Sequence, residues 1–304
     1  MSRLARRGFL AAAAGAPFLR GQASTAGHRP RLGVVIDVHR EDRVDKEFAR
    51  VRELGLTCCQ AHVGEMPAIA LAGPIRDAAK KYQVEVTAAM TLGPGKIDWD
   101  FYGGPRTCGL VPADLRAQRI QALTLASDLA KACGIGAIHT HCGFIPEDPN
   151  LPLYRDTVDA IRKVAGHVRA NGQIFLMETG QESPVTLLRA ITDTGLDNVK
   201  VNLDVANLIL YGKGEPVGAL DVIGQYVRGL HAKDGLYPTN PRQLGKEVPI
   251  GQGRVNFPEV IRKLKQLNYT GPITIEREIE GPQQGADIQA SRVFLEKLIQ
   301  QIYG

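Results

Sequence analysis

A chain of 304 residues that is 44% hydrophobic and 23% charged is long enough for one large globular domain or two small ones. No uninterrupted apolar stretch reaches the roughly 18 residues that a spanning helix needs, which argues against stable insertion in a membrane. The formal net charge of +5 is concentrated at the start, because residues 1–26 hold four of the 37 basic residues and no acidic one. The remaining 33 basic and 32 acidic residues nearly cancel, which argues against nucleic acid as a partner.

Residues 1–26 resemble a twin-arginine export signal. The Arg-Arg pair at 6–7 is followed by a short alanine-rich apolar segment and by small residues, with cleavage expected after Ala23 or Ala26. A basic tail that happens to contain such a pair is the alternative. We therefore expect a mature domain over residues 27–304, exported to the periplasm or the cell exterior. Because this pathway carries proteins that fold before export, often with a metal inserted, a metal site is worth seeking.

From residue 31 onward, short apolar stretches alternate with longer amphipathic ones. The short stretches have the length and the β-branched content of strands, and they cover residues 31–39, 56–64, 84–92, 135–143, 172–180, 199–207, 227–235 and 271–279. Patterns with helical spacing separate them, at 45–54, 73–82, 114–133, 154–170, 184–194, 216–227 and 257–268. Eight strands alternating with helices predict a single-domain (β/α)8 TIM barrel. A doubly wound open sheet is the alternative, but neither of its phosphate-binding glycine motifs is present.

Two of the predicted strand-to-helix connections are long. One runs over 93–114 and contains Trp99, and the other runs over 235–256 and is rich in glycine and proline. Such loops lie on the C-terminal face of a barrel, where the active sites of this fold are found. We expect these loops to cover a substrate, with Trp99 among the substrate-binding residues; insertions without a role are the alternative.

Polar residues end four successive predicted strands: Glu178, Asp204, His231 and Glu276. Because side chains alternate between the two faces of a strand, Asp204 shares a face with Asn202 rather than with its apolar neighbours. The same parity turns the other three side chains toward the barrel axis. All four can therefore converge at the mouth of the barrel.

Three carboxylates that meet at one point would repel one another and raise one another's pKa unless a cation neutralised them. One imidazole and three carboxylates form a set of ligands suited first to Mn²⁺, with Mg²⁺, Co²⁺ or Zn²⁺ as alternatives. Each residue alone could equally be a helix cap or an ion-pair partner. Their combination on four successive strands predicts a shared divalent-metal site.

Several segments resemble those of the sugar phosphate isomerase/epimerase family, the xylose isomerase-like TIM barrels. The resemblance spans about residues 31–300 and is carried by METGQES, NLDVANLILYGKGEP, GLHAKDGLYP, EVPIGQGRVNFPEVIRKLK and GPITIEREI. It implies that the metal is held by Glu178, Asp204, His231 and Glu276. Many relatives, ketose 3-epimerases included, have a histidine three residues after the strand-six aspartate, where this chain has Asn207. The substrate of those epimerases is therefore not assumed here, and Asn207 is a candidate substrate contact.

Other polar residues near the predicted strand ends are weaker candidates. We expect His62, His141 and Gln181 to bind substrate, although buried histidines often serve only as hydrogen-bonded core residues. Asp234 and Glu278 are expected to support metal ligands from the second layer, with a turn cap or an arginine pair as the alternatives.

This site predicts removal of a proton next to a carbonyl through an enediolate. Glu178 and Glu276, on opposite sides of the metal, would take and return the proton. We therefore expect a metal-dependent isomerase or epimerase of a small carbohydrate, a sugar or keto-sugar, with a homo-oligomer left open. A lyase or dehydratase of a keto-sugar or keto-glycoside at the same site is the alternative. A noncatalytic sugar-binding barrel and an endonuclease-IV-like repair enzyme rank lower, since the latter needs a three-metal cluster with more histidines.

Overall fold

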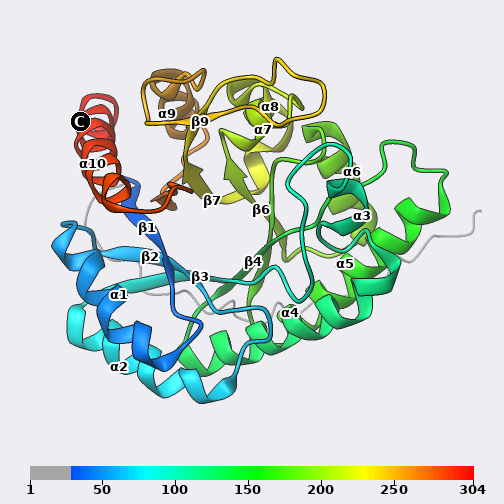
Figure 1. Cartoon of the computed structure of the whole chain (residues 1–304), viewed down its shortest axis with the longest axis horizontal. Helices are drawn as coiled ribbons and strands as arrows, with labels where there is room; N and C mark the ends of the chain where they lie inside the picture. Colours follow the sequence, from blue (N-terminus) through cyan, green and yellow to red (C-terminus); the bar gives the residue numbers. More distant parts are fainter. Residues whose placement is uncertain (1–28) are drawn as a thin grey trace, which may run out of the picture.

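Eight parallel strands close into a barrel in the computed structural model, which describes residues 29–304 (Figure 1). The strands are β1 (Arg31–Asp37), β2 (Cys58–His62), β3 (Glu85–Met90), β4 (Ala137–His141), β5 (Ile174–Glu178), β6 (Val199–Asp204), β7 (Val227–Ala232) and β10 (Pro272–Ile275). The barrel closes where β1 pairs with β10, with Arg31 beside Pro272. The predicted (β/α)8 barrel is confirmed, whereas the predicted export signal lies outside the described residues.

Helices surround the strands in Figure 1. The long ones are α1 (Glu41–Glu53), α2 (Ala72–Tyr82), α4 (Ala113–Cys133), α5 (Pro152–Ala170), α6 (Pro184–Thr194), α8 (Pro216–Ile223), α9 (Phe257–Gln266) and α10 (Pro282–Tyr303). Shorter pieces are α3 (Gly104–Thr107), α7 (Asn207–Leu210) and the 3-10 turns η1 (Ile69–Leu71) and η2 (Gly224–Tyr226). Within residues 29–304, no helix is both long enough and apolar enough to cross a membrane.

Helix α1 illustrates how the sequence pattern produces this layer. Val44, Phe48 and Val51 recur at helical spacing and are the residues that α1 buries against the barrel. Helices α4 and α6 end where Gly134 and Gly195 adopt left-handed φ values of 76° and 67°. The helix expected over 216–227 stops earlier, at Ile223, because a tighter 3-10 turn leads directly into β7.

The barrel interior contains buried polar side chains, whereas the layer between strands and helices is apolar. Gln60 of β2 and Asn202 of β6 are fully buried, and Gln60 Nε2 donates a hydrogen bond to Asn202 Oδ1 at 2.9 Å. A Cβ at Gly229 of β7 would collide with Asn202 Oδ1, so glycine there leaves room for this pair. Hydrogen bonding across the axis makes burial of these amides tolerable.

The two long connections are built differently. In the first, Leu110 donates its backbone N–H to the carbonyl of Cys142 at 2.9 Å, which seats the segment on the end of β4. The second contains an antiparallel pair, β8 (Asp234–Gly235) and β9 (Glu247–Val248), which the strand pattern did not predict.

Asp234 anchors this second connection and does not contact a metal ligand, contrary to expectation. Its carboxylate accepts backbone hydrogen bonds from Gly251 and Gly253 at 2.9 Å and from Val255 at 3.1 Å. A Cβ at Gly253 would collide with this carboxylate. The physical reason for the difference is direction: Asp234 has the opposite parity to His231 along the chain, so it turns toward the loop.

Candidate metal centre

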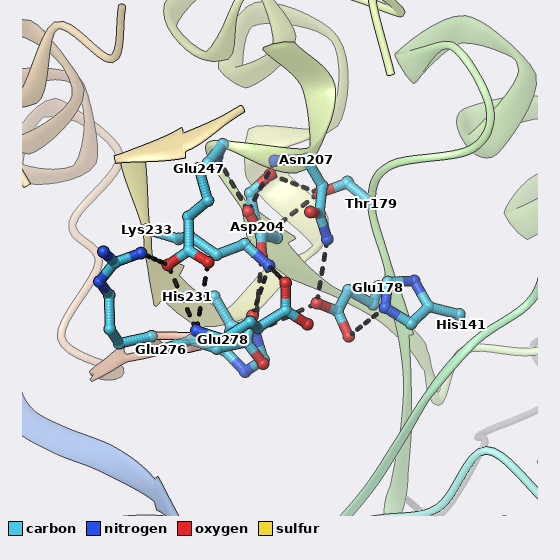
Figure 2. A network of polar contacts seen from close by, with 12 residues as sticks. His141, Glu178, Thr179, Asp204, Asn207, His231, Lys233, Glu247, Glu276 and Glu278 are labelled. Atoms are coloured by element: carbon cyan, nitrogen blue, oxygen red, sulfur yellow. Dashed lines mark hydrogen bonds and ion pairs between the residues drawn. The ribbon is translucent and has the colours of Figure 1, made fainter. Parts of the chain in front are cut away.

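Four polar side chains meet at the C-terminal ends of neighbouring strands (Figure 2). Glu178 and Asp204 are the last residues of β5 and β6, His231 is the last but one of β7, and Glu276 follows β10 directly. The barrel order places β5, β6, β7 and β10 side by side, and Asp204 is the register partner of His231. The structure therefore brings together the four residues that the sequence pattern singled out.

The four side chains are close enough to share one ion. His231 Nδ1 lies 3.1 Å from Glu178 Oε1, 3.2 Å from Glu276 Oε2 and 3.7 Å from Asp204 Oδ2. One ligand atom from each residue lies within 4.8 Å of the others. The side chains of Glu178, Asp204 and His231 are at most 1% exposed and that of Glu276 is 12% exposed, so the cluster is shielded from water.

Two atoms of this cluster show that a cation fits. Asp204 Oδ2 and His231 Nδ1 are buried and face only charged groups of the centre: Oδ2 lies 3.2 Å from Lys233 Nζ, and Nδ1 lies between carboxylates. Asp204 Oδ1, by contrast, accepts from the backbone amides of Ala206 and Asn207 at 2.9 and 2.8 Å. A divalent ion would bind both Oδ2 and Nδ1 and would offset the carboxylate charge gathered around them.

His231 is oriented by Gln60, which the sequence analysis did not identify. Gln60 Oε1 lies 2.7 Å from His231 Nε2, while Gln60 Nε2 donates to Asn202. The amide oxygen therefore faces the imidazole, so Nε2 carries a hydrogen and Nδ1 is the nitrogen that faces the carboxylates. The only signal in the sequence was a polar residue inside the apolar stretch CCQAH.

A proton competes with a cation for His231 Nδ1. Burial lowers the pKa of His231, but the Glu276 and Glu178 carboxylates outweigh burial and raise this pKa well above its usual value. Binding of a metal through Nδ1 must displace that proton, so metal affinity falls as the pH falls.

Glu178 is held as an anion by histidines. Its Oε2 lies 2.5 Å from His139 Nε2 and 3.2 Å from His141 Nε2, and Asn207 Nδ2 donates to its Oε1 at 3.5 Å. Burial raises the pKa of Glu178, but His141, His139 and His231 outweigh burial and hold it well below its usual range. This leaves an ionised carboxylate inside the barrel.

Lys233 supplies a fixed positive charge that the sequence analysis did not assign to the site. Its Nζ lies 2.8 Å from Glu276 Oε2, 2.9 Å from Glu278 Oε2 and 3.2 Å from Asp204 Oδ2, and the side chain is 1% exposed. Burial lowers the pKa of Lys233, but the three carboxylates outweigh burial and hold it well above its usual value. Lys233 stands two residues after His231, and this shared parity along the strand was the signal that could have identified it.

With Lys233 included, the charges of the centre match a divalent ion. Once His231 has lost its Nδ1 proton, the three carboxylates Glu178, Asp204 and Glu276 and the one ammonium group leave two negative charges, which one divalent cation neutralises. Glu278 contacts this centre through Lys233, and its side chain is 60% exposed. Glu278 thus supports Glu276 indirectly rather than by direct contact.

Most of the predicted substrate-binding residues gather beside Glu178. His141 Nδ1 lies 3.2 Å from Gln181 Oε1, and the Trp99 ring meets the His141 ring edge-on with 5.3 Å between centroids. Trp99 is 44% exposed, as a residue at the opening of a site would be. Asn207 completes this group through its contact with Glu178.

His62 lies elsewhere on the mouth. Its Nδ1 is 3.4 Å from Asp37 Oδ1, at the ends of β1 and β2. It lines a cavity of about 310 Å³ that runs between β1, α1 and α10 and that Glu276 also borders.

Comparisons with known proteins agree with this geometry. The sequence model of the xylose isomerase-like TIM barrel family matches residues 42–298. The structure of a xylose isomerase domain protein from Planctomyces limnophilus is 32% identical, with a TM-score of 0.84 over 90% of this chain and 99% of that one.

More distant structures share the fold. A xylose isomerase-like TIM barrel protein from Mycobacterium smegmatis, solved with magnesium, is 17% identical, with a TM-score of 0.68 over 91% of this chain and 98% of that one. The structure of 3-keto-D-glucoside 4-epimerase from E. coli is 15% identical, with a TM-score of 0.65 over 88% of this chain and 100% of that one. An uncharacterised protein of Methanocaldococcus jannaschii is 32% identical over 97 residues, which are 32% of this chain and 31% of that protein.

Proposed function

Since the chain belongs to the xylose isomerase-like TIM barrel family, we propose that it is a divalent-metal-dependent isomerase or epimerase of a sugar or keto-sugar. The supporting observation is the buried cluster of Glu178, Asp204, His231 and Glu276, in which one ligand atom from each residue lies within 4.8 Å of the others. These four residues would hold the cation, with Mn²⁺ first among the ions that suit three carboxylates and one imidazole. When bound, such a cation polarises a substrate carbonyl and stabilises negative charge that develops on its oxygen.

The two glutamates are placed to move a proton at the substrate. Glu178 projects from β5 and Glu276 from the end of β10, two strands that β6 and β7 separate in the barrel. Either carboxylate can take the proton from the carbon next to the carbonyl, and the other can return one to the opposite face. The stereocentre of the substrate decides which glutamate acts first.

The surrounding residues keep both glutamates ionised, which suits the one that takes the proton; the other must carry a proton before it can return one. His139 and His141 keep Glu178 ionised, and Lys233 does the same for Glu276. Burial raises the pKa of Glu276, but His231 and Lys233 outweigh burial and hold it well below its usual range. The segment that carries Trp99 lies against His141, where it would shield the reacting carbon from water.

The substrate is proposed to be a free sugar or a keto-glycoside rather than a sugar phosphate. The support is the export signal expected in residues 1–26, which would place the protein in the periplasm or outside the cell, and the lack of a glycine-rich phosphate motif in the sequence.

Exchange of substrate hydrogen with solvent tests this function. Metal-loaded protein is incubated in D₂O with a panel of ketoses and keto-glycosides, and deuterium next to the carbonyl is measured by mass spectrometry and NMR. Incorporation together with an epimer or isomer supports the proposal. Exchange with an unsaturated product would assign a lyase instead, and no exchange with any member of the panel would count against both.

A further inference from the structure

A second group of metal-ligating side chains lies at the ends of β1 and β2, outside the centre described above. Asp37 is the last residue of β1, His39 follows it by two positions, and His62 is the last residue of β2. We propose that Asp37, His39 and His62 form a second divalent-cation site, suited to a borderline ion such as Co²⁺, Ni²⁺ or Zn²⁺. Of these three residues, the sequence pattern singled out only His62, as a substrate contact.

The ligand atoms of this site converge on one carboxylate oxygen. Asp37 Oδ1 lies 2.5 Å from His39 Nδ1 and 3.4 Å from His62 Nδ1, and one such atom from each residue lies within 4.8 Å of the other two. Two imidazoles and one carboxylate on one side of an ion, with open positions for water, are a recurrent set of ligands for borderline divalent metals. Between 28% and 35% of each side chain is exposed, so ions can enter from solvent.

The local backbone builds this arrangement. Asp37 and His62 are register partners in the parallel β1–β2 pair, which brings their side chains together. The backbone N–H of His39 donates to Asp37 Oδ1 at 3.2 Å, which holds the carboxylate in place. Gly64 has a φ of 89°, and a Cβ there would lie 3.0 Å from His39 Cβ, so the missing side chain leaves room for the imidazole.

The charges around the second site predict weaker binding than at the first. Arg43 NH1 lies 3.6 Å from Asp37 Oδ2, the oxygen that faces away from the imidazoles, and Arg43 NH2 lies 3.3 Å from Glu47 Oε1. The second site thus has one carboxylate and a neighbouring guanidinium, whereas the first has three carboxylates. Imidazole ligands shift its preference from Mg²⁺ toward Co²⁺, Ni²⁺ and Zn²⁺.

The second site borders a cavity that reaches one ligand of the first. Asp37, His62 and Glu276 line this space of about 310 Å³, which runs between β1, α1 and α10. A cation held by Asp37 and the two histidines would face that space, where it offers substrate oxygens a second anchoring point. The inference does not depend on the proposed isomerase activity, because it concerns metal binding alone.

Cobalt binding to the untagged full-length chain tests this site. Metal-stripped protein is titrated with Co²⁺, with stoichiometry measured by calorimetry and ligation by visible absorption. We expect the natural chain to bind two Co²⁺ ions, one tightly and one more weakly. Asp204→Asn should weaken only the tight binding. The double variant His39→Ala/His62→Ala should abolish only the weaker binding.

His167→Ala is the matched control. His167 Nε2 lies 2.7 Å from Asp128 Oδ1 on the surface of α5, so it is an Asp–His pair outside both sites, and its loss should leave both equivalents. If the double variant does not fold, Asp37→Asn provides the test, because it keeps the shape of the side chain. It should lower the affinity for the second Co²⁺ ion at least tenfold. A single equivalent in the natural chain, or a second one that survives both His39→Ala/His62→Ala and Asp37→Asn, would overturn the proposal.

Discussion

Gln60 Oε1 accepts a hydrogen bond from His231 Nε2 at 2.7 Å, across the barrel interior from β2 to β7. This contact decides which imidazole nitrogen faces the carboxylates, so a neutral amide 171 positions away in the chain prepares the nitrogen ligand.

Replacing Gln60 by leucine should weaken metal binding. Without the amide oxygen, His231 loses its preferred tautomer and orientation, and we expect a loss of about 10–100-fold in affinity for Mn²⁺, measured by calorimetry. Gln173→Leu is the control, because Gln173 is also buried but lies just before β5 and hydrogen-bonds Ser127 of α4, at the opposite end of the strand from Glu178. Equal affinity in the Gln60→Leu variant and the natural chain would show that the contact has no part in metal binding.

Replacing Glu276 by glutamine should abolish most proton transfer. We expect the rate of deuterium exchange to fall by about 10²–10⁴-fold, because an amide cannot accept the proton. Glu278→Gln is matched to it, since Glu278 contacts the same lysine but is 60% exposed and has no contact with His231. In the Glu278→Gln variant the rate of deuterium exchange should change by less than about tenfold. Equal losses of rate in the two variants would argue against a role for Glu276 in the reaction.

Replacing Lys233 by methionine should destabilise the metal-free protein. Removing one partner of a buried ion pair leaves the Asp204 and Glu276 charges uncompensated, at a cost of about 3–5 kcal/mol. Mn²⁺ should restore part of that loss, so the midpoint of thermal unfolding should rise more with Mn²⁺ in the variant than in the natural chain. Lys213→Met, which removes a half-buried lysine 3.6 Å from Glu147, should cost less than about 1 kcal/mol. If the metal-free Lys233→Met variant and the metal-free natural chain had the same midpoint of thermal unfolding, Lys233 would not stabilise the centre.

Glu182 should make stability depend on pH. Both of its carboxylate oxygens are buried without a hydrogen-bond partner in the described chain, and burial raises its pKa from 4.5 to about 8. Between these values the folded state keeps a proton that the unfolded state releases, so stability falls as the pH rises from about 4.5 to about 8.

The isosteric change Glu182→Gln removes this dependence. We expect the variant to be more stable than the natural chain at pH 8, by on the order of 4 kcal/mol, and nearly equal to it at pH 4.5. Urea unfolding at both pH values measures the difference, with exposed Glu53→Gln of α1 as the control. If the difference in the free energy of unfolding between the Glu182→Gln variant and the natural chain did not change with pH, Glu182 would be ionised in the folded state.

Much of the architecture follows from local patterns. All eight predicted strands are present in the barrel, each shorter than its apolar stretch, because residues at both ends enter turns and loops. The β8–β9 pair and the short helices α3 and α7 were not predicted, since their few residues take their conformation from the barrel beneath them.

The barrel and the meeting of Glu178, Asp204, His231 and Glu276 could be predicted from local patterns, because strand parity and strand ends are local properties of the chain. The surroundings of these four residues could not be predicted in this way. The contact of Gln60 with His231 and the pairing of Asp37 with His62 depend on the register between strands and on closure of the barrel. The turn of Asp234 toward the loop depends on the path of residues 251–255. Such relationships join segments far apart in the chain, and no periodicity within a single segment records them.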